Sequence, residues 1–301
     1  MLPLKNELRS KISVIILCAG EGTRFKEITK NLPKPLLKIK SLNNTTILHH
    51  TINNFIKLGI NQIAVIKGHL GYQIDEFISS LQKIKKDLTD KLLIIDSGFD
   101  YKLGPLYSFL SMTKNNMIFK KDNLFLVIPG DTIFEFNLLN DIIITLMNNS
   151  NLIQEYPILF YRKIKVSNLK EKHNNVIQNS PKFISIVQIE SKNSKTFLKA
   201  IQQEDLRVVQ DLEIIKQVIP IFLFNFKIVN KFLKLKEKIS ANTIREIITY
   251  MINNGEKIIA IEIDNRFEFY DIDSKLDLYN YNLKKKKMDN RNSDFTQICS
   301  K

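Results

Sequence analysis

The sequence is poor in cysteine, and this absence limits the classes of protein to which it can belong. Cys18 and Cys299 are the only cysteines among 301 residues, too few for a disulfide framework or a cysteine-ligated zinc site. A reducing compartment fits this composition, and we expect a cytoplasmic protein. No stretch approaches the roughly 20 apolar residues that a membrane-spanning helix needs, so no membrane span is expected.

Arginine is also scarce. The formal net charge is +14, from 45 basic and 31 acidic residues, but only seven of the basic residues are arginine. Lysine is less suited than arginine to bidentate recognition of phosphates and bases. The sequence also shows no basic helix and no aromatic stacking surface. We therefore expect no nucleic-acid partner. Residues 284–301 hold six basic and two acidic residues, and this segment is expected to be a solvated, disordered tail.

The beginning of the chain has some features of a signal peptide. Three basic residues precede the apolar run of residues 12–19. A lipoprotein signal would need small residues directly before Cys18, where Ile16 and Leu17 stand. The run also leads straight into a glycine-rich loop, so we interpret it as a buried first strand.

The first half of the chain alternates apolar runs of strand length with segments of helical periodicity. Strands are predicted at residues 13–18, 62–66, 92–96 and 124–129, and helices at residues 47–58, 74–84 and 106–117. This alternation predicts an α/β fold with a Rossmann-like, doubly wound sheet, whose ligands collect at the carboxyl ends of the strands.

The second half is less regular, and its longer strands make a mixed sheet the expectation. Strands are predicted at residues 158–163, 183–190, 218–226, 258–264 and 268–272, and helices at residues 138–147, 244–253 and 274–282. Ser274 is a suitable N-cap for the last helix. No internal repeat is present.

The most informative segment follows the first predicted strand, where an Ala-Gly-x-Gly loop ends at Gly22. Such a loop can adopt positive φ and approach a ligand closely, and its successive N–H groups form an anion-binding concavity. Arg24 stands two residues after Gly22, and Lys34 lies between two prolines that restrict the backbone. Two positioned cations beside such a loop predict a polyphosphate site. The spacing matches neither a P-loop nor a dinucleotide fingerprint.

Residues 17–25 and 32–37 together resemble the signature of the sugar-phosphate nucleotidyltransferases, the family that includes glucose-1-phosphate thymidylyltransferase and mannose-1-phosphate guanylyltransferase. The resemblance extends over residues 12–282. Its further motifs are Thr46-Ile47-Leu48, residues 59–68, Leu103-Gly104-Pro105-Leu106, Gly130-Asp131-Thr132-Ile133-Phe134 and Tyr270-Asp271-Ile272-Asp273-Ser274. It implies the nucleotide-diphospho-sugar transferase fold, with an acceptor-binding region inserted between Asp131 and Asp271.

The reaction implied by the resemblance is attack of a sugar-phosphate oxygen on the α-phosphorus of a nucleoside triphosphate, with pyrophosphate leaving. Arg24 would hold the β- and γ-phosphates, and Lys34 would neutralise the α-phosphate or the leaving group. Mg²⁺ would be the cofactor, with Asp131, Asp271 and Asp273 as candidate ligands. Asp271 is preferred to Asp273 as the metal ligand from the motif that contains both. The nucleotide would be held by Leu17, Ala19, Gly20, Glu21, Gly22, Thr23, Asp96 and Gly104.

Each carboxylate also has a simpler interpretation. Asp131 could be a turn residue after its strand, and Asp271 and Asp273 could be cap and loop residues before the last helix. Asp96 could be an ordinary strand terminus instead of a base-reading residue. The functional interpretation is favoured because Asp131, Asp271, Arg24 and Lys34 occur together.

Two departures from the family pattern concern the substrates. Pro105 stands where the family has Thr-Ala after the glycine, which removes a backbone donor. The acceptor-side Glu-Lys-Pro is replaced by residues 200–204, which contain no lysine. Lys199 or Arg207 could substitute, or the acceptor could be a smaller phosphate such as phosphocholine or a polyol phosphate. The sequence is compatible with any nucleobase in the nucleoside triphosphate.

The predicted organisation is one catalytic domain, residues 1–283, followed by the tail of residues 284–301. Residues 12–131 would bind the nucleotide, residues 132–270 the acceptor, and residues 271–283 would close the site. The partners would be a nucleoside triphosphate and a sugar 1-phosphate or small alcohol phosphate. A homo-oligomer is compatible with the sequence. The alternative function is a non-catalytic regulator that binds nucleotides or nucleotide sugars.

Overall fold

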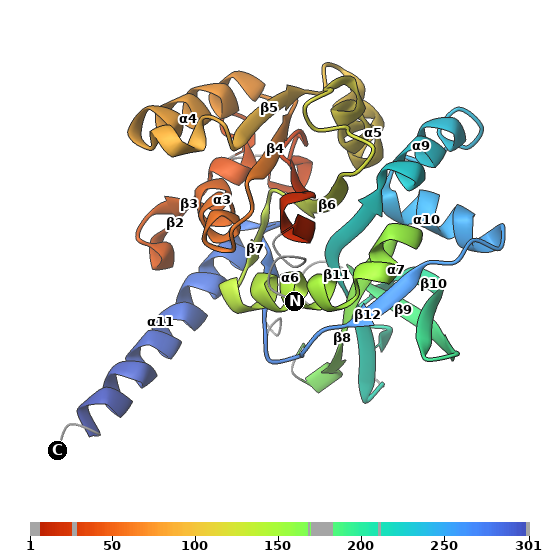
Figure 1. Cartoon of the computed structure of the whole chain (residues 1–301). Helices are drawn as coiled ribbons and strands as arrows, with labels where there is room; N and C mark the ends of the chain where they lie inside the picture. Colours follow the sequence, from red (N-terminus) through yellow and green to blue (C-terminus); the bar gives the residue numbers. More distant parts are fainter. Residues whose placement is uncertain (1–6, 26–28, 168, 170–182, 210–211, 299–301) are drawn as a thin grey trace.

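The computed structural model describes residues 7–25, 29–167, 169, 183–209 and 212–298, without the side chains of Arg24 and of residues 287–298. Its centre is a nine-stranded mixed sheet with the order β5-β4-β1-β6-β11-β8-β12-β10-β9 (Figure 1). The first four of these strands are parallel, and their bounds are β1 (Ile12–Leu17), β4 (Gln62–Lys67), β5 (Leu92–Asp96) and β6 (Leu124–Pro129). The predicted strands of the first half are confirmed to within one residue at each end.

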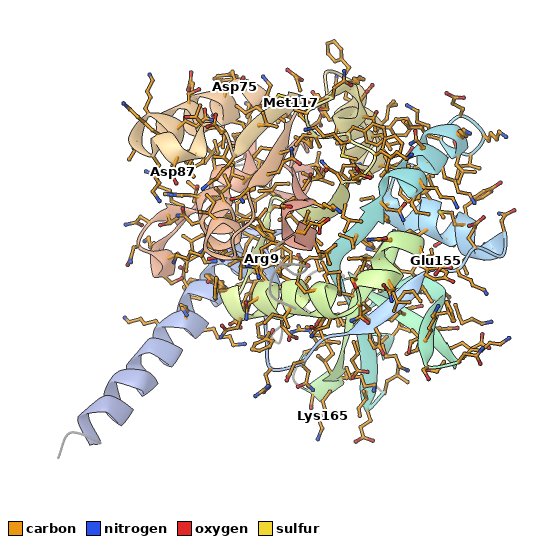
Figure 2. The ribbon with its side chains drawn as sticks, viewed as in Figure 1. Arg9, Asp75, Asp87, Met117, Glu155 and Lys165 are labelled. Atoms are coloured by element: carbon orange, nitrogen blue, oxygen red, sulfur yellow. The ribbon has the colours of Figure 1, made fainter. Side chains whose placement is uncertain are left out.

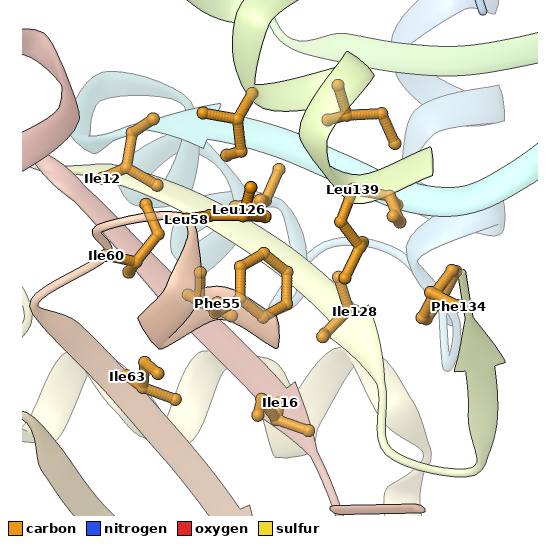
Figure 3. Packing of buried hydrophobic residues seen from close by; sticks show 14 of the residues in the cluster. Ile12, Ile16, Phe55, Leu58, Ile60, Ile63, Leu126, Ile128, Phe134 and Leu139 are labelled. Carbon is orange, nitrogen blue, oxygen red and sulfur yellow. The ribbon is translucent and has the colours of Figure 1, made fainter. Parts of the chain in front are cut away.

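The sheet is covered on both faces, which confirms the α/β prediction. Alternate residues of the strands join two separate apolar clusters, because side chains point to opposite faces along a strand. One face is covered by α3 (Ile47–Lys57), α4 (Gly71–Ile84) and α6 (Phe136–Asn148). The other is covered by α5 (Pro105–Leu110), α9 (Phe226–Leu235) and α10 (Ile244–Asn253). Figure 3 shows Phe55 of α3 among Ile16, Ile63 and Leu126 of the strands.

The helix predicted over residues 106–117 is shorter than expected. α5 ends at Leu110 and continues only as a 3₁₀ turn, Ser111–Lys114. Ser111 Oγ donates to the Ser108 carbonyl and Thr113 Oγ1 to the Leu110 carbonyl, each at 2.7 Å. Hydroxyl groups that bond nearby carbonyls compete with helical hydrogen bonding, which the apolar periodicity alone does not reveal.

The second half of the sheet is antiparallel apart from one strand pair. It contains β8 (Ile158–Lys165), β9 (Phe183–Lys192), β10 (Lys195–Asp205), β11 (Ile214–Asn225) and β12 (Ile259–Glu262). A further pairing, between Gln217 of β11 and Ile186 of β9, closes these five strands into a ring. In Figure 2, Glu155 and Lys165 mark this half, and Asp75 and Met117 mark the parallel half.

Strand β10 was not predicted. Residues 195–205 mix charged, amide and apolar side chains, and a bulge between Leu198 and Ala200 interrupts their alternation. The strand forms because Asn193 and Ser194, at φ of 50° and 60°, turn the chain back onto β9. Positive φ at two central residues suits a two-residue hairpin turn.

The other elements lie near the loops. They are β2 (Lys38–Ile39), β3 (Thr45–Thr46), β7 (Thr132–Phe134), α7 (Ser150–Glu155), β13 (Phe269–Asp271) and α11 (Lys275–Ile298). Ser274 caps α11 as predicted, since its Oγ accepts from the Asp277 N–H at 3.2 Å. None of the described helices has the length and apolar character needed to cross a membrane.

The segment expected to be a disordered tail, residues 284–301, begins inside α11, and residues 299–301 lie outside the described residues. α11 runs without interruption to Ile298 and extends away from the rest of the molecule (Figure 1). Residues 284–298 contain no glycine or proline, and lysine is a good helix former. Charge alone is therefore not a reason to end the helix at residue 283.

Candidate functional site

The glycine-rich segment after β1 forms one wall of a cavity of about 420 Å³ at the carboxyl ends of β1 and β6. Most of the residues expected there line it, namely Leu17, Ala19, Gly20, Gly22 and Thr23. The remaining wall is made by Cys18, Lys34, Pro35, Tyr101, Pro105, Ser108, Pro129, Asp131 and Asp273. The cavity therefore lies at the sheet edge where a doubly wound fold places its ligands.

The two glycines of the loop have different roles. Gly22 has a φ of 63°, and a Cβ atom there would lie 2.9 Å from the Thr29 side chain and 3.2 Å from Lys34 Cγ. A Cβ atom at Gly20 would meet nothing within 4 Å. Gly22 is thus required by the packing of the loop onto Lys34, whereas Gly20 leaves space on the side of the loop that a ligand can approach.

Lys34 is a buried cation held between two carboxylates. It lies in a 3₁₀ turn, Lys34–Leu36, and is 7% exposed. Its Nζ atom is 3.3 Å from Asp131 Oδ2 and 3.0 Å from Asp273 Oδ1. Burial alone would lower the pKa of Lys34, but the charges of Asp131 and Asp273 and the hydrogen bonds to both outweigh it. The pKa therefore lies above its ordinary value of 10.5.

The two carboxylates come from segments 142 residues apart, and a small sheet joins them. β7 and β13 pair antiparallel, with Thr132 opposite Asp271. The Asp273 N–H donates to Asp277 Oδ2 at 3.2 Å, which fixes the chain just after β13. Asp271, which was expected before Asp273, accepts a hydrogen bond from Thr132 Oγ1 through its Oδ1 at 2.6 Å. Asp273 is the residue that shares Lys34 with Asp131.

A second cavity, of about 610 Å³, adjoins the first. The two share Leu17, Pro105, Pro129 and Asp273, so they meet where Asp273 and the ends of β1 and β6 come together. Asp131 lines only the smaller cavity and Asp271 only the larger one. The other walls of the larger cavity come from β9, β10, β11, β13, α10 and α11. Asp273 is therefore positioned to act between ligands bound in the two cavities.

Residues 13–151 match the protein-family model described as nucleotidyl transferase. This part of the chain is similar to the nucleotidyl transferase family. A curated relative, the bifunctional protein GlmU of Methanococcus aeolicus, is 32% identical over 171 residues, which are 54% of this chain and 37% of that protein. The choline-phosphate cytidylyltransferase of Streptococcus pneumoniae is 30% identical over 113 residues, 37% of this chain and 45% of that protein. The chain thus spans less than half the length of either relative.

The likeness in fold to a solved structure extends through nearly the whole chain. A UDP-glucose pyrophosphorylase complexed with UDP-glucose superposes with a TM-score of 0.65 over 92% of this chain and 99% of that one. Sequence identity between the two is 16%, so this comparison establishes the fold only. The second half, with its ring of strands, therefore belongs to the same mixed α/β fold as residues 13–151.

Not every residue expected at the nucleotide site lines the smaller cavity. Asp96 is directed to Lys67, 3.3 Å away, with a side chain 61% exposed, and it lines neither cavity. Glu21 is exposed and lines neither cavity. Arg24 lies in the 3₁₀ turn Thr23–Phe25, but its side chain is outside the described part of the structure.

Gly104 serves the junction between the two halves of the chain. Its φ is 111°, and a Cβ atom there would lie 2.5 Å from the Asn242 carbonyl oxygen. That oxygen accepts from the Leu106 N–H at 3.0 Å, so the start of α5 is joined to the loop before α10. Its neighbour Pro105 lines both cavities, although it supplies no N–H.

Sequence reasoning missed Tyr101 and Ser108, which also line the smaller cavity. Tyr101 packs where Gly68 lacks a side chain, since a Cβ atom at Gly68 would lie 2.8 Å from the Tyr101 ring. The sequence contains both partners of this contact, Gly68 after the second predicted strand and Tyr101 shortly before Gly104. Only the fold shows that these residues face each other.

The cations of the larger cavity are not those expected. Lys199 pairs with Glu190 at 2.8 Å and Arg207 pairs with Asp205, and neither lines one of these two cavities. Arg245, at the start of α10, and Lys284 of α11 line the larger cavity instead. Within the described residues, Arg245 has no carboxylate partner at ion-pair distance.

The carboxylates fit a magnesium ion that is shared with a substrate. In the described part of the chain, no three His, Cys, Asp or Glu side chains form a group that could hold a metal on their own. Asp131 and Asp273 supply two carboxylates around one ammonium. Mg²⁺ in phosphate-transferring sites is held by one or two carboxylates together with phosphate oxygens and water.

Proposed function

We propose that this protein transfers a nucleotidyl group from a nucleoside triphosphate to the phosphate of a sugar 1-phosphate or a related small alcohol phosphate, releasing pyrophosphate. The single observation that carries the proposal is Lys34 Nζ held between Asp131 and Asp273 at the point where two cavities meet. A positioned cation and two carboxylates between two binding spaces suit phosphoryl chemistry, which depends on positioning and charge neutralisation.

The smaller cavity would hold the nucleoside triphosphate. Its glycine-rich wall, Ala19 to Thr23, supports this assignment because backbone N–H groups can approach phosphate oxygens there. Arg24 would bind the β- and γ-phosphates. Lys34 would stabilise the negative charge that develops on the α-phosphate oxygens as the reaction proceeds.

The larger cavity would hold the acceptor, so that residues 132–270 act as an acceptor-binding region inserted into the nucleotide-binding fold. Arg245 and Lys284 are the cations that would replace the lysine of the family pattern and bind the acceptor phosphate. The names of the relatives support this type of acceptor, since they include a choline-phosphate cytidylyltransferase and a UDP-glucose pyrophosphorylase.

The proposed step is an in-line displacement. An acceptor phosphate oxygen forms a bond to the α-phosphorus, the bond from the α-phosphorus to the bridging oxygen breaks, and pyrophosphate leaves with the electron pair. Asp131 and Asp273 would hold Mg²⁺, which would supply charge neutralisation when bound. Asp271 would keep the β7–β13 sheet aligned through Thr132, so Asp273 is the better candidate for the second ligand.

The decisive experiment measures pyrophosphate release by the purified protein. Each of the common nucleoside triphosphates is combined, with Mg²⁺, with a panel of sugar 1-phosphates, polyol phosphates and phosphocholine. We expect release that depends on one nucleotide, one class of acceptor and the metal, and that stops with EDTA. Nucleotide binding without pyrophosphate release across the whole panel would refute catalysis and favour a regulator.

A further inference from the structure

The larger cavity contains an amide side chain whose orientation the fold determines. Gln217 of β11 is 9% exposed and lines the cavity at the position where β11 meets β9. Its Oε1 atom accepts a hydrogen bond from Arg162 Nε at 3.0 Å. A guanidinium group can only donate, so the oxygen of the amide must face Arg162 and the NH₂ group must face away from it.

Arg162 is itself held firmly. It is 2% exposed, its Nη1 donates to the Phe267 carbonyl at 2.6 Å, and both Nη atoms lie 3.3 Å from Glu268 Oε2. Its guanidinium also stacks over the Phe269 ring at 4.7 Å. Because each of its nitrogens has a partner, Arg162 cannot rotate to release Gln217 without losing several buried contacts.

The Gln217 Nε2 atom has no hydrogen-bond acceptor among the described residues. Two amide N–H groups thus remain for a ligand in the cavity. Neutral polar side chains also line the cavity, namely Ser185 and Gln203 on paired positions of β9 and β10 and Asn280 on α11. A surface of this kind recognises neutral oxygen atoms such as hydroxyl groups.

Part of the aromatic and acidic lining of the same cavity is already engaged by the protein's own groups. A quaternary ammonium group binds aromatic faces, but Arg162 already stacks over Phe269 and Lys284 lies over the Tyr270 ring at 5.3 Å. The lining carboxylate Asp277 accepts from Ser274 Oγ at 2.8 Å and from the Asp273 N–H. The protein's own groups therefore already contact two of the aromatic rings and one of the carboxylates that line the cavity.

We propose that Gln217, oriented by Arg162, is a specificity-determining residue that donates hydrogen bonds to a hydroxyl oxygen on the body of the acceptor. This inference rests on the proposed function. It assigns the acceptor to phosphate esters of sugars or other polyols and not to phosphocholine. An acceptor without a suitable oxygen would leave the buried amide unpaired, and sites built on buried donors reject such ligands strongly.

The first part of the test uses the unaltered chain and compares the acceptors of the panel above. We expect kcat/KM for a sugar or polyol phosphate to exceed that for phosphocholine by about 100-fold or more. Single deoxy analogues of the preferred acceptor are then measured, and one of them should lose about tenfold or more in kcat/KM. Preference for phosphocholine, or equal use of every deoxy analogue, would overturn the inference.

The second part uses Gln217→Met with Gln188→Met as its matched control. Gln188 is the same residue type on β9 but lies in neither cavity and bonds Gln202. We expect Gln217→Met to raise the acceptor KM about tenfold and to leave the nucleotide KM unchanged. The variant should use the preferred acceptor and the sensitive deoxy analogue equally well, because the hydrogen bond that distinguishes them is already lost. An unchanged acceptor KM in a folded Gln217→Met protein would contradict the inference. If this variant does not fold, the single deoxy analogues measured with the unaltered chain decide whether the inference holds. Absence of turnover with every acceptor would instead refute the proposed function.

Discussion

The two cavities are built in different ways. The smaller one is formed mainly by loops at the ends of parallel strands, and much of its wall comes from the single segment Leu17 to Pro35. The larger one is formed by side chains from strands and helices that are distant in sequence, such as Gln217, Arg245 and Lys284. A site concentrated in one segment leaves a recognisable sequence motif, whereas a site assembled by topology does not.

This difference matches the comparisons with other proteins. The nucleotidyl transferase family model ends at residue 151, before the first strand of the ring. Beyond that point the superposition continues, with 16% sequence identity over the aligned part of the chain. If the smaller cavity performs the shared chemistry and the larger one selects the acceptor, substitutions in the two cavities should have separable effects.

The largest effect is expected where the cavities meet. Asp131→Asn and Asp273→Asn should each lower kcat by about 10³-fold or more, because each removes a negative charge proposed to hold Mg²⁺. Asp271→Asn should lower it far less, since that carboxylate binds Thr132. Steady-state pyrophosphate release and a circular dichroism spectrum of each variant are the measurements. A larger loss for Asp271→Asn than for Asp273→Asn would reverse the assignment.

Lys34→Met should lower kcat by about 100-fold through loss of charge stabilisation. Its effect on stability has a defined pH dependence. The pKa of Lys34 is raised in the folded state above 10.5, so its stabilising contribution is complete below the unfolded pKa and disappears as the pH rises through the folded pKa. The Tm difference between the two proteins should stay constant from about pH 6 to about pH 9. A difference that shrinks within this range would show that Lys34 titrates at lower pH.

Gly22→Ala tests the loop of the smaller cavity, with Gly20→Ala as its control. A side chain at a φ of 63° that also approaches Thr29 to 2.9 Å should lower the free energy of unfolding by about 1–3 kcal/mol. Gly20→Ala, with open space around it, should change it by less than about 0.5 kcal/mol. Urea unfolding measures both. Equal effects would mean that the loop tolerates a side chain equally well at its two glycines.

Arg245→Ala should raise the acceptor KM about tenfold and leave the nucleotide KM unchanged, since Arg245 lines only the larger cavity. Arg207→Ala is the control, because Arg207 pairs with Asp205 away from both cavities. Initial rates at varied acceptor and nucleotide concentrations separate the two constants. A rise in the nucleotide KM would indicate that Arg245 contributes to nucleotide binding and not to acceptor binding.

The sequence was a good guide where local pattern determines structure. The third and fourth strands begin and end at the predicted residues, Leu92–Asp96 and Leu124–Pro129, because each is an apolar run bounded by polar or turn residues. Lys34 and Asp131 were expected at one site, and the structure brings them within 3.3 Å. Strand β10 was missed because its pattern is broken by a bulge and its partner strand lies in the other arm of a hairpin.

The choice between Asp271 and Asp273 could not be made from sequence. The two residues are two positions apart, so in any strand their side chains would point to the same face. Only the end of β13 at Asp271 distinguishes them, since Asp273 lies beyond the strand and turns toward Lys34. Arg162 and Gln217 were equally hidden, because nothing in sequence relates two strand residues 55 positions apart.

The ring of strands also has a consequence for the order in which the protein can fold during synthesis. β12 pairs in parallel with β8, with Ile259 opposite Ile158, and it also contacts β10. The four parallel strands of the first half need nothing after Pro129 to pair with one another. The ring cannot close until Glu262, the end of β12, has left the ribosome. The glycine-loop side of the protein can therefore assemble while the larger cavity is still an open, curved sheet.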